Sequence, residues 1–282
     1  MKMKKYIMAV CLLAAGTFAL TSCGEKESIV TLNVNLEKPV ASKGYIDGER
    51  LPHLVTGDCA YVNDGAFAFD FENGDPILRV NHASDNVYRA IFPAYIVDSI
   101  ANPNIAHLDN VRVKIPQVQR YETENGVQKV DMPMISYPDG YQLWFKNICS
   151  IVKVNVTNPL TTPVTLTNIQ MLNNAAGQSG QGSVYLAGNT RVNVTSSEPV
   201  ITVDQNPMYR SVLLNFDTNE PDAIIAPGET RSYMLVVAPF ENASGMIIVI
   251  NTTAFSQAVE GIENVTELPR NCIANVNHTF QP

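Results

Sequence analysis

Basic residues are scarce in this sequence, and so are stacking aromatics. Its 282 residues include 19 Lys and Arg against 27 Asp and Glu, which gives a formal net charge of −8. Nucleic-acid binding requires clustered Lys and Arg, and adsorption to anionic lipid requires positive charge. Neither nucleic acid nor an anionic lipid surface is therefore an expected partner. The chain has a single Trp, which is a poor supply of stacking rings for a carbohydrate-active site.

Spacings that mark a catalytic or metal site are also missing. The histidines His53, His82, His107 and His278 have neither H-x-x-x-H nor H-E-x-x-H spacing, and no G-x-S-x-G elbow is present. The acidic residues around Asn73-Gly74 do not match an EF-hand loop and are interpreted as a solvated turn. We expect no metal, no cofactor and no enzymatic activity. A hydrolase whose paired carboxylates meet only in the fold stays open as an alternative.

The first 22 residues have the pattern of a bacterial lipoprotein signal peptide. Lys2, Lys4 and Lys5 form a basic start, and the apolar stretch 6–20 is too short for a stable membrane span. It ends in Leu20-Thr21-Ser22-Cys23, which resembles a lipobox. This pattern predicts a signal peptide over 1–22, acylation of Cys23 and a polar tether over 23–27. The alternative is an ordinary secretory signal in which Cys23 is incidental.

Cysteine use gives no disulfide framework. After removal of the signal and acylation of Cys23, the residues Cys59, Cys149 and Cys272 remain, an odd number without C-x-x-C spacing. We interpret all three as small buried apolar side chains. The sequence leaves open whether two of them form a bridge.

Apolar residues recur with a period of two, which predicts an all-β protein. Alternation is regular in Val30-Thr31-Leu32-Asn33-Val34-Asn35-Leu36, and Asn73-Gly74 supplies the positive-φ residues of a tight hairpin turn. Further strands are predicted within 67–71, 77–80, 111–115, 151–156, 164–166, 212–216, 233–237 and 246–250. Short helices are expected only near 96–101 and 256–262, and Trp144 is expected in the core.

Strands at this spacing, joined by polar turns, predict antiparallel sandwiches, and the length favours two in tandem. The turn Pro138-Asp139-Gly140 is the best boundary. We expect an N-terminal sandwich over 28–138 and a C-terminal sandwich over 139–282.

Several local signatures, taken in order, resemble the fimbrillin family of Bacteroidetes-type bacteria, the lipoprotein precursors of type V pili. They are the lipobox at Cys23 followed by the strand Val30–Leu36, the segment Tyr88-Arg89-Ala90-Ile91-Phe92-Pro93-Ala94, the motif Met132-Pro133-Met134, the amphipathic stretch 143–154 and the closing motif Leu268-Pro269-Arg270-Asn271. Each signature is weak alone, but together they span nearly the whole chain.

The resemblance implies a mechanical role in a fimbrium at the cell surface. Family members have two transthyretin-like sandwiches and reach the outer membrane as lipid-anchored precursors. An Arg-specific protease then removes the first strand, and a strand from a neighbouring subunit fills the vacated groove. Here that strand would be 29–37, with Val30, Leu32, Val34 and Leu36 on the groove face, and Arg50 is the expected cleavage point because it follows a Gly-rich polar stretch.

The end of the sequence departs from the stalk subunits of this family, which carry a C-terminal donor extension. Only residues 271–282 follow Pro269-Arg270, about the length of one strand that completes the second sandwich. This favours a tip or capping subunit that accepts a strand and gives none. The alternative is that this last strand itself is donated. A surface ligand- or glycan-binding lipoprotein that does not polymerise is the competing function.

Overall fold

The protein is built almost entirely of β-strands. The computed structural model describes residues 28–37, 40–41, 54, 56–99, 101, 103–124, 127–130, 132–174, 184–193, 198–259, 262 and 265–281. In these ranges the helical elements are two short 3-10 turns, η1 (Ala94–Ile96) and η2 (Pro221–Ala223). No helix in the described part is long and apolar enough to span a bilayer. The expected all-β class is confirmed.

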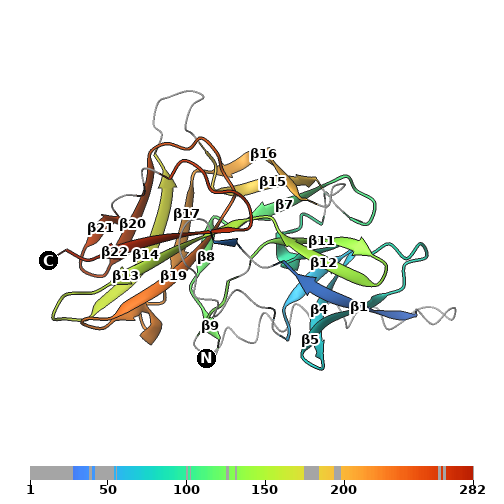
Figure 1. Ribbon diagram of the computed structural model, residues 1–282, viewed down its shortest axis with the longest axis horizontal. Helices are drawn as coiled ribbons and strands as arrows, with labels where there is room; N and C mark the ends of the chain where they lie inside the picture. Colours follow the sequence, from blue (N-terminus) through green and yellow to red (C-terminus); the bar gives the residue numbers. More distant parts are fainter. Residues whose placement is uncertain are drawn as a thin grey trace.

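Seven strands close into a barrel, seen on the right of Figure 1. In spatial order they are β1 (Ile29–Leu36), β12 (Gln142–Asn147), β11 (Met134–Asp139), β6 (Ala90–Phe92), β3 (Cys59–Val62), β4 (Gly65–Glu72) and β5 (Asp75–Asn81). The β4–β5 hairpin turns at Asn73 and Gly74, whose φ angles of 55° and 93° are those of the predicted tight turn.

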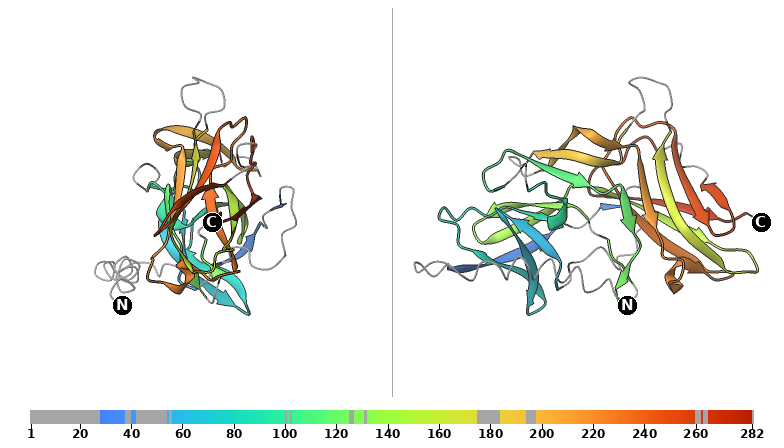
Figure 2. Two further views of the ribbon diagram at one scale, coloured as in Figure 1. Left: turned by 90° about the vertical axis from the view of Figure 1, so that its left-hand side faces the viewer. Right: turned by 180° about the vertical axis from the view of Figure 1, so that it is seen from behind.

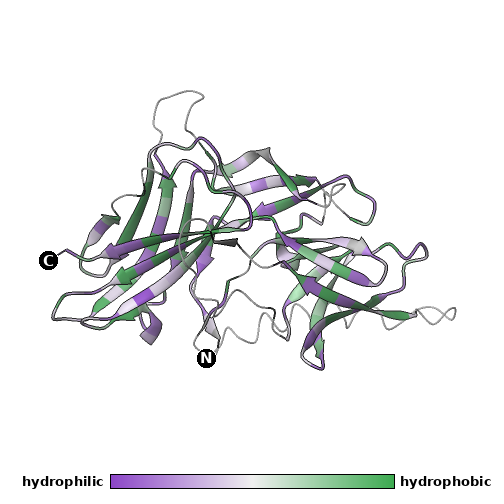
Figure 3. Ribbon diagram, in the orientation of Figure 1, coloured by the Kyte–Doolittle hydropathy of each residue, from purple (hydrophilic) through white to green (hydrophobic). Residues whose placement is uncertain are grey.

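β1 is the strand that closes this barrel, because it pairs antiparallel with β5 on one edge and parallel with β12 on the other. The sequence predicted a sandwich here. The difference arises because the parallel β1–β12 pair joins the two edges that a sandwich would leave apart. Apolar and polar residues alternate along the strands, visible as green and purple bands in Figure 3, and the inward residues form the apolar cluster inside the barrel.

Two open sheets that share one core are built mainly from the second half of the chain (Figure 1, left). One sheet has the order β19 (Thr230–Val237), β13 (Ser150–Thr157), β22 (Cys272–Thr279) and β2 (Val40–Ala41). The other has the order β21 (Ser256–Val259), β20 (Met246–Thr252), β14 (Val164–Asn173), β17 (Ser211–Asn215) and β8 (Val118–Arg120), with β18 (Ile224–Ile225) beside β14. The strands predicted over 151–156, 212–216, 233–237 and 246–250 are observed within a few residues of those bounds, and the strand predicted to start at 164 continues to Asn173 as β14.

The two halves are joined by strands from both sides of the expected boundary. β7 (Asn110–Ile115) pairs with β15 (Ala187–Asn193), which pairs with β16 (Val200–Tyr209), and β8 pairs with β17. A small ribbon is formed by β9 (Thr123–Glu124) and β10 (Val127–Gln128). The boundary expected at 138/139 lies within β11, and the β11–β12 hairpin stays with the barrel. Figure 2 shows the barrel and the two open sheets at opposite ends of one elongated molecule.

Two local expectations were wrong. In the segment expected to be helical near 256–262, residues 256–259 are extended, since β21 pairs with β20 there. Trp144 is 47% exposed, because its neighbours Leu143 and Phe145 are the buried residues of β12 and alternation turns the ring outward.

Candidate functional site at the barrel-closing strand

β1 is held by backbone hydrogen bonds along both edges. Residues 29–33 pair antiparallel with residues 77–81, and residues 33–36 pair in parallel with residues 142–145. The antiparallel ladder continues where the His82 N–H donates to the Ser28 carbonyl at 2.9 Å. The parallel ladder includes the Asn33 N–H, which donates to the Tyr141 carbonyl at 2.9 Å. β1 is therefore paired with a neighbouring strand on both of its edges.

The apolar side chains expected on the groove face point into the barrel. Leu32 has no exposed surface and Val34 is 7% exposed, while Val30 and Leu36 are half-buried against the same cluster. Ile29, by contrast, is 69% exposed at the start of the same strand. Burial of one such aliphatic side chain contributes roughly 1.5–3 kcal/mol. The inward face is thus the main apolar contact of β1 with the barrel.

The surface beneath β1 is a continuous apolar cluster contributed by the other six barrel strands. Phe69 lies within it, with ring centroids 5.8 Å from Phe92 and 6.2 Å from Phe145 in edge-to-face arrangements. The remaining strand residues of the cluster are Ala60, Val62, Leu78, Val80, Ala90, Met134 and Leu143. Without β1 this cluster would face solvent between the unpaired edges of β5 and β12.

A polar network fixes the end of β1. The Glu37 carboxylate oxygen Oε2 accepts a hydrogen bond from the Asn147 N–H at 2.9 Å and from Arg270 Nη1 at 2.9 Å. The Glu37 N–H donates to the Phe145 carbonyl at 2.9 Å, and the Glu37 carbonyl accepts from Asn147 Nδ2 at 3.3 Å. Arg270 belongs to the loop before β22, so this network ties β1 to the second half of the chain.

The chain after β1 also contacts the second half. β2 pairs in parallel with β22, with Val40 opposite Cys272 and Ala41 opposite Ile273. Residues 29–41 therefore add a strand to the barrel and then a short strand to the neighbouring sheet.

Cys23 and Arg50 lie outside the described residues, and their predicted roles stay predictions. Sequence reasoning missed Glu37, Asn147 and Arg270 as parts of the site. Glu37 is the charged residue that ends the alternating run, and Arg270 lies in the closing motif. Nothing in one sequence joins two residues 233 positions apart.

No disulfide joins Cys59, Cys149 and Cys272 to one another in the described part of the chain. Cys149 is fully buried, as expected, and burial raises the pKa of its thiol far above the ordinary value. Cys59 and Cys272 are half-buried. A thiol that stays protonated is a poor nucleophile. We therefore interpret Cys149 as a small apolar side chain of the core.

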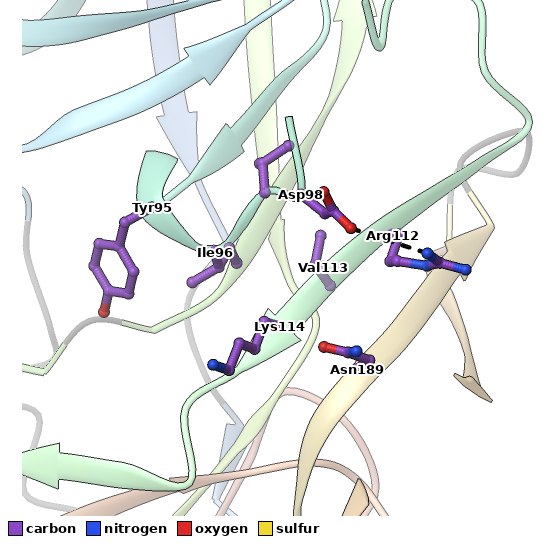
Figure 4. Close-up of a pocket in the computed structure, with 8 residues that line it drawn as sticks. Tyr95, Ile96, Asp98, Arg112, Val113, Lys114 and Asn189 are labelled. Carbon is purple, nitrogen blue, oxygen red and sulfur yellow. Dashed lines mark ion pairs between the residues drawn. The ribbon is translucent and has the colours of Figure 1, made fainter. Parts of the chain in front are cut away.

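A shallow pocket lies beside η1, β7 and β15, away from β1 (Figure 4). Its volume is about 230 Å³, below the roughly 300–1,000 Å³ of typical small-molecule sites. Asp98 and Arg112 form an ion pair of 3.9 Å at its rim, and Tyr95, 64% exposed, lies at its edge. Among the residues that the structure describes, no group of three or more His, Cys, Asp and Glu is placed to hold a metal.

Comparison with known proteins yields fold matches alone. No family model and no curated protein matches the chain. A solved candidate cell adhesion protein from Bacteroides ovatus aligns with 91% of this chain and 94% of its own, at 12% identity and a TM-score of 0.50. The chain has the fold of that protein.

Two further solved structures are similar over most of their length. A candidate cell adhesion protein from Bacteroides uniformis aligns with 89% of this chain and 94% of its own, at 12% identity and a TM-score of 0.46. The tip fimbrial protein Mfa3 from Porphyromonas gingivalis, with a C-terminal truncation, aligns with 79% and 89%, at 10% identity and a TM-score of 0.36. These two neighbours are an adhesion protein and a fimbrial protein.

Proposed function

We propose that this protein is a structural and adhesive subunit of a cell-surface fimbrium that joins its neighbour by strand exchange. The chain is exported as a precursor anchored to the outer membrane through lipid on Cys23. An Arg-specific protease cuts after Arg50, β1 leaves, and a strand from another subunit takes its place. Neither catalysis nor a cofactor has a part in this role.

The observation that carries the proposal is that β1 alone closes the barrel. All its partners, β5, β12 and the cluster beneath it, come from residues after 50. A cut after Arg50 would therefore separate the closing strand from everything that holds it. The remaining attachment would be non-covalent, and a competing strand could replace it.

The gap left by β1 fits an incoming strand. β5 would present its backbone groups on one side and β12 on the other, and unpaired edges of this kind bind extended chains by β-augmentation. The apolar cluster between them would offer pockets to alternate side chains. These two features together favour an extended segment with the period-two pattern of β1.

The tandem transthyretin-like arrangement expected from the sequence is part of the proposal. In the barrel, β1 lies between an antiparallel partner, β5, and a parallel partner, β12. In the second half, β13 lies between an antiparallel partner, β19, and a parallel partner, β22. Each half thus joins its first strand to its last in parallel, which supports two related units.

A tip or capping position is supported by the way β22 is held. It pairs with β13 over residues 151–157 and 273–279, and Ile273 and Phe280 are buried in the second core. Donation of this strand would open that core. A subunit that accepts a strand and keeps its own last strand would end a fibre.

The test is cleavage followed by exchange. The purified precursor is treated with an Arg-specific protease, and a fluorescent peptide of residues 28–37 is added as the competing strand. We expect one product that begins at Leu51, and we expect the peptide to enter it and displace the cleaved strand. The variant Arg50→Lys is the matched control, because it keeps the charge but removes the cleavage point.

Two results would contradict the proposal. One is a product cut elsewhere, or equal cleavage of the Arg50→Lys variant. The other is correct cleavage without any exchange of β1, which would leave the barrel closed and unable to accept a neighbour. The second result would favour a surface protein that does not polymerise.

A further inference from the structure

Glu37 is recognised by groups that do not belong to β1. Its carboxylate accepts hydrogen bonds from the Asn147 N–H and from Arg270 Nη1, both at 2.9 Å. Asn147 ends β12, and Arg270 precedes β22. These donors would stay in place when β1 leaves, so they form part of the receiving surface.

The receiving groups are held by contacts of their own. Arg270 Nη1 also donates to the Asn147 carbonyl at 3.0 Å, and Arg270 Nη2 forms an ion pair with Glu198. The Asn147 side chain donates to Asn271 Oδ1 at 2.5 Å. A guanidinium positioned in this way needs little rearrangement to meet a carboxylate, which lowers the entropic cost of binding.

The pair between Glu37 and Arg270 is partly shielded from water. The Glu37 side chain is 21% exposed and that of Arg270 is 20% exposed. Glu198, the other carboxylate on Arg270, is 59% exposed. Solvent screens an exposed pair more strongly than a shielded one. Of the two carboxylates that pair with Arg270, Glu37 is the better shielded. Its replacement should therefore weaken strand binding more than replacement of Glu198.

A carboxylate at one end of the groove fixes both the direction and the register of the strand. Period-two alternation alone is satisfied by a shift of two residues or by reversal of the strand. Either change would move the carboxylate away from Arg270. A strand with its carboxylate directly after the last inward apolar side chain, running parallel to β12, satisfies all contacts together.

We infer that Arg270 and Asn147 select the incoming strand, and that the partner is an extended segment with alternating apolar side chains followed at once by Asp or Glu. The inference rests on the strand exchange proposed above and names the chemistry of its partner.

The last strand of a second copy does not provide such a segment. Residues 271–282 contain no Asp or Glu. With Phe280 in the place of Leu36, the polar side chain of His278 would lie where Val34 is buried, and the neutral Gln281 would face Arg270. Residues 271–282 of this chain are therefore a poor match to the receiving groups.

The test measures peptide exchange in the full chain, cut at a protease site engineered between residues 42 and 50 so that β1 remains bound until it is displaced. Three fluorescent peptides of residues 28–37 are compared: the natural sequence, Glu37→Gln, and Asn33→Glu combined with Glu37→Gln. The third keeps the net charge but moves the carboxylate by four residues, so that a shift that returned it to Arg270 would leave half of the inward apolar positions unfilled. We expect Glu37→Gln to bind about tenfold more weakly, the change that 1.4 kcal/mol produces, and the relocated carboxylate to give no recovery.

The protein variant Arg270→Met completes the comparison, with its fold checked by circular dichroism and thermal melting. It should discriminate between the natural and Glu37→Gln peptides less than unchanged protein does, because only the Asn147 N–H still meets the carboxylate. A peptide of residues 271–282 should bind unchanged protein no better than the Glu37→Gln peptide does. Equal binding of the first two peptides to unchanged protein, or undiminished discrimination in Arg270→Met, would overturn the inference while leaving strand exchange intact. Failure of the natural peptide to enter would overturn the exchange itself and the inference with it.

Discussion

Replacement of Leu32 by alanine is expected to destabilise the uncleaved protein strongly. Leu32 has no exposed surface, lies opposite Leu78 of β5 and packs into the barrel cluster. Truncation of a buried leucine costs about 2–5 kcal/mol, because it loses apolar burial and leaves a cavity. The matched control is Ile29→Ala in the same strand. Ile29 is 69% exposed, so this change should alter the free energy of unfolding by about 0.5 kcal/mol or less.

Urea denaturation and thermal melting measure the difference. In a protein of this size, 1 kcal/mol shifts the melting temperature by roughly 2–4 °C, so Leu32→Ala should lower it by about 4–20 °C. Limited proteolysis of the folded state should also release the strand more readily in Leu32→Ala, because β1 is the element that loses contacts. Equal effects of Leu32→Ala and Ile29→Ala would refute the reasoning, since they would mean that the inward face of β1 does not hold the barrel closed.

Two other predictions concern the outer edge of β19 and the single Trp. The side-chain amide of Gln128 donates to the Met234 carbonyl and accepts from the Met234 N–H, both at 2.8 Å. The amide of Gln119 donates to the Val236 carbonyl at 2.6 Å and accepts from the Val236 N–H at 2.9 Å. These two side chains therefore take the hydrogen-bonding positions that a neighbouring strand would use along β19. The double variant Gln119→Ala and Gln128→Ala should free this edge and raise the average mass in sedimentation experiments; an unchanged mass would show that the amides do not protect it. Trp144 lies opposite Asn35 of β1, so loss of β1 should change its fluorescence, and the variant Trp144→Phe should abolish this signal.

The local pattern of the strands was predictable from the sequence. Alternation over 30–36 gave the strand and its inward face, and Asn73-Gly74 gave the hairpin, because both depend on neighbouring residues. The same rule, applied to Leu143 and Phe145, places Trp144 outside. Its expected burial was wrong because Trp144 was assigned to the core as the start of an apolar strand, whereas it takes an outward position in the alternation of that strand.

The closure of the barrel was not predictable in this way. The parallel pairing of β1 with β12 joins residues 33–36 to residues 142–145, and no local signal encodes so distant a partner. The network between Glu37 and Arg270 is more distant still. The sequence showed two charged residues at the ends of two motifs, and only the fold brings them within hydrogen-bonding distance.

The most direct test of the central claim, that the first strand is removed during assembly, is the N-terminal sequence and intact mass of the protein in fimbriae sheared from native cells. We expect a chain that begins at Leu51 and carries no lipid. A chain that begins at an acylated Cys23 and still contains β1 would contradict strand exchange in this subunit.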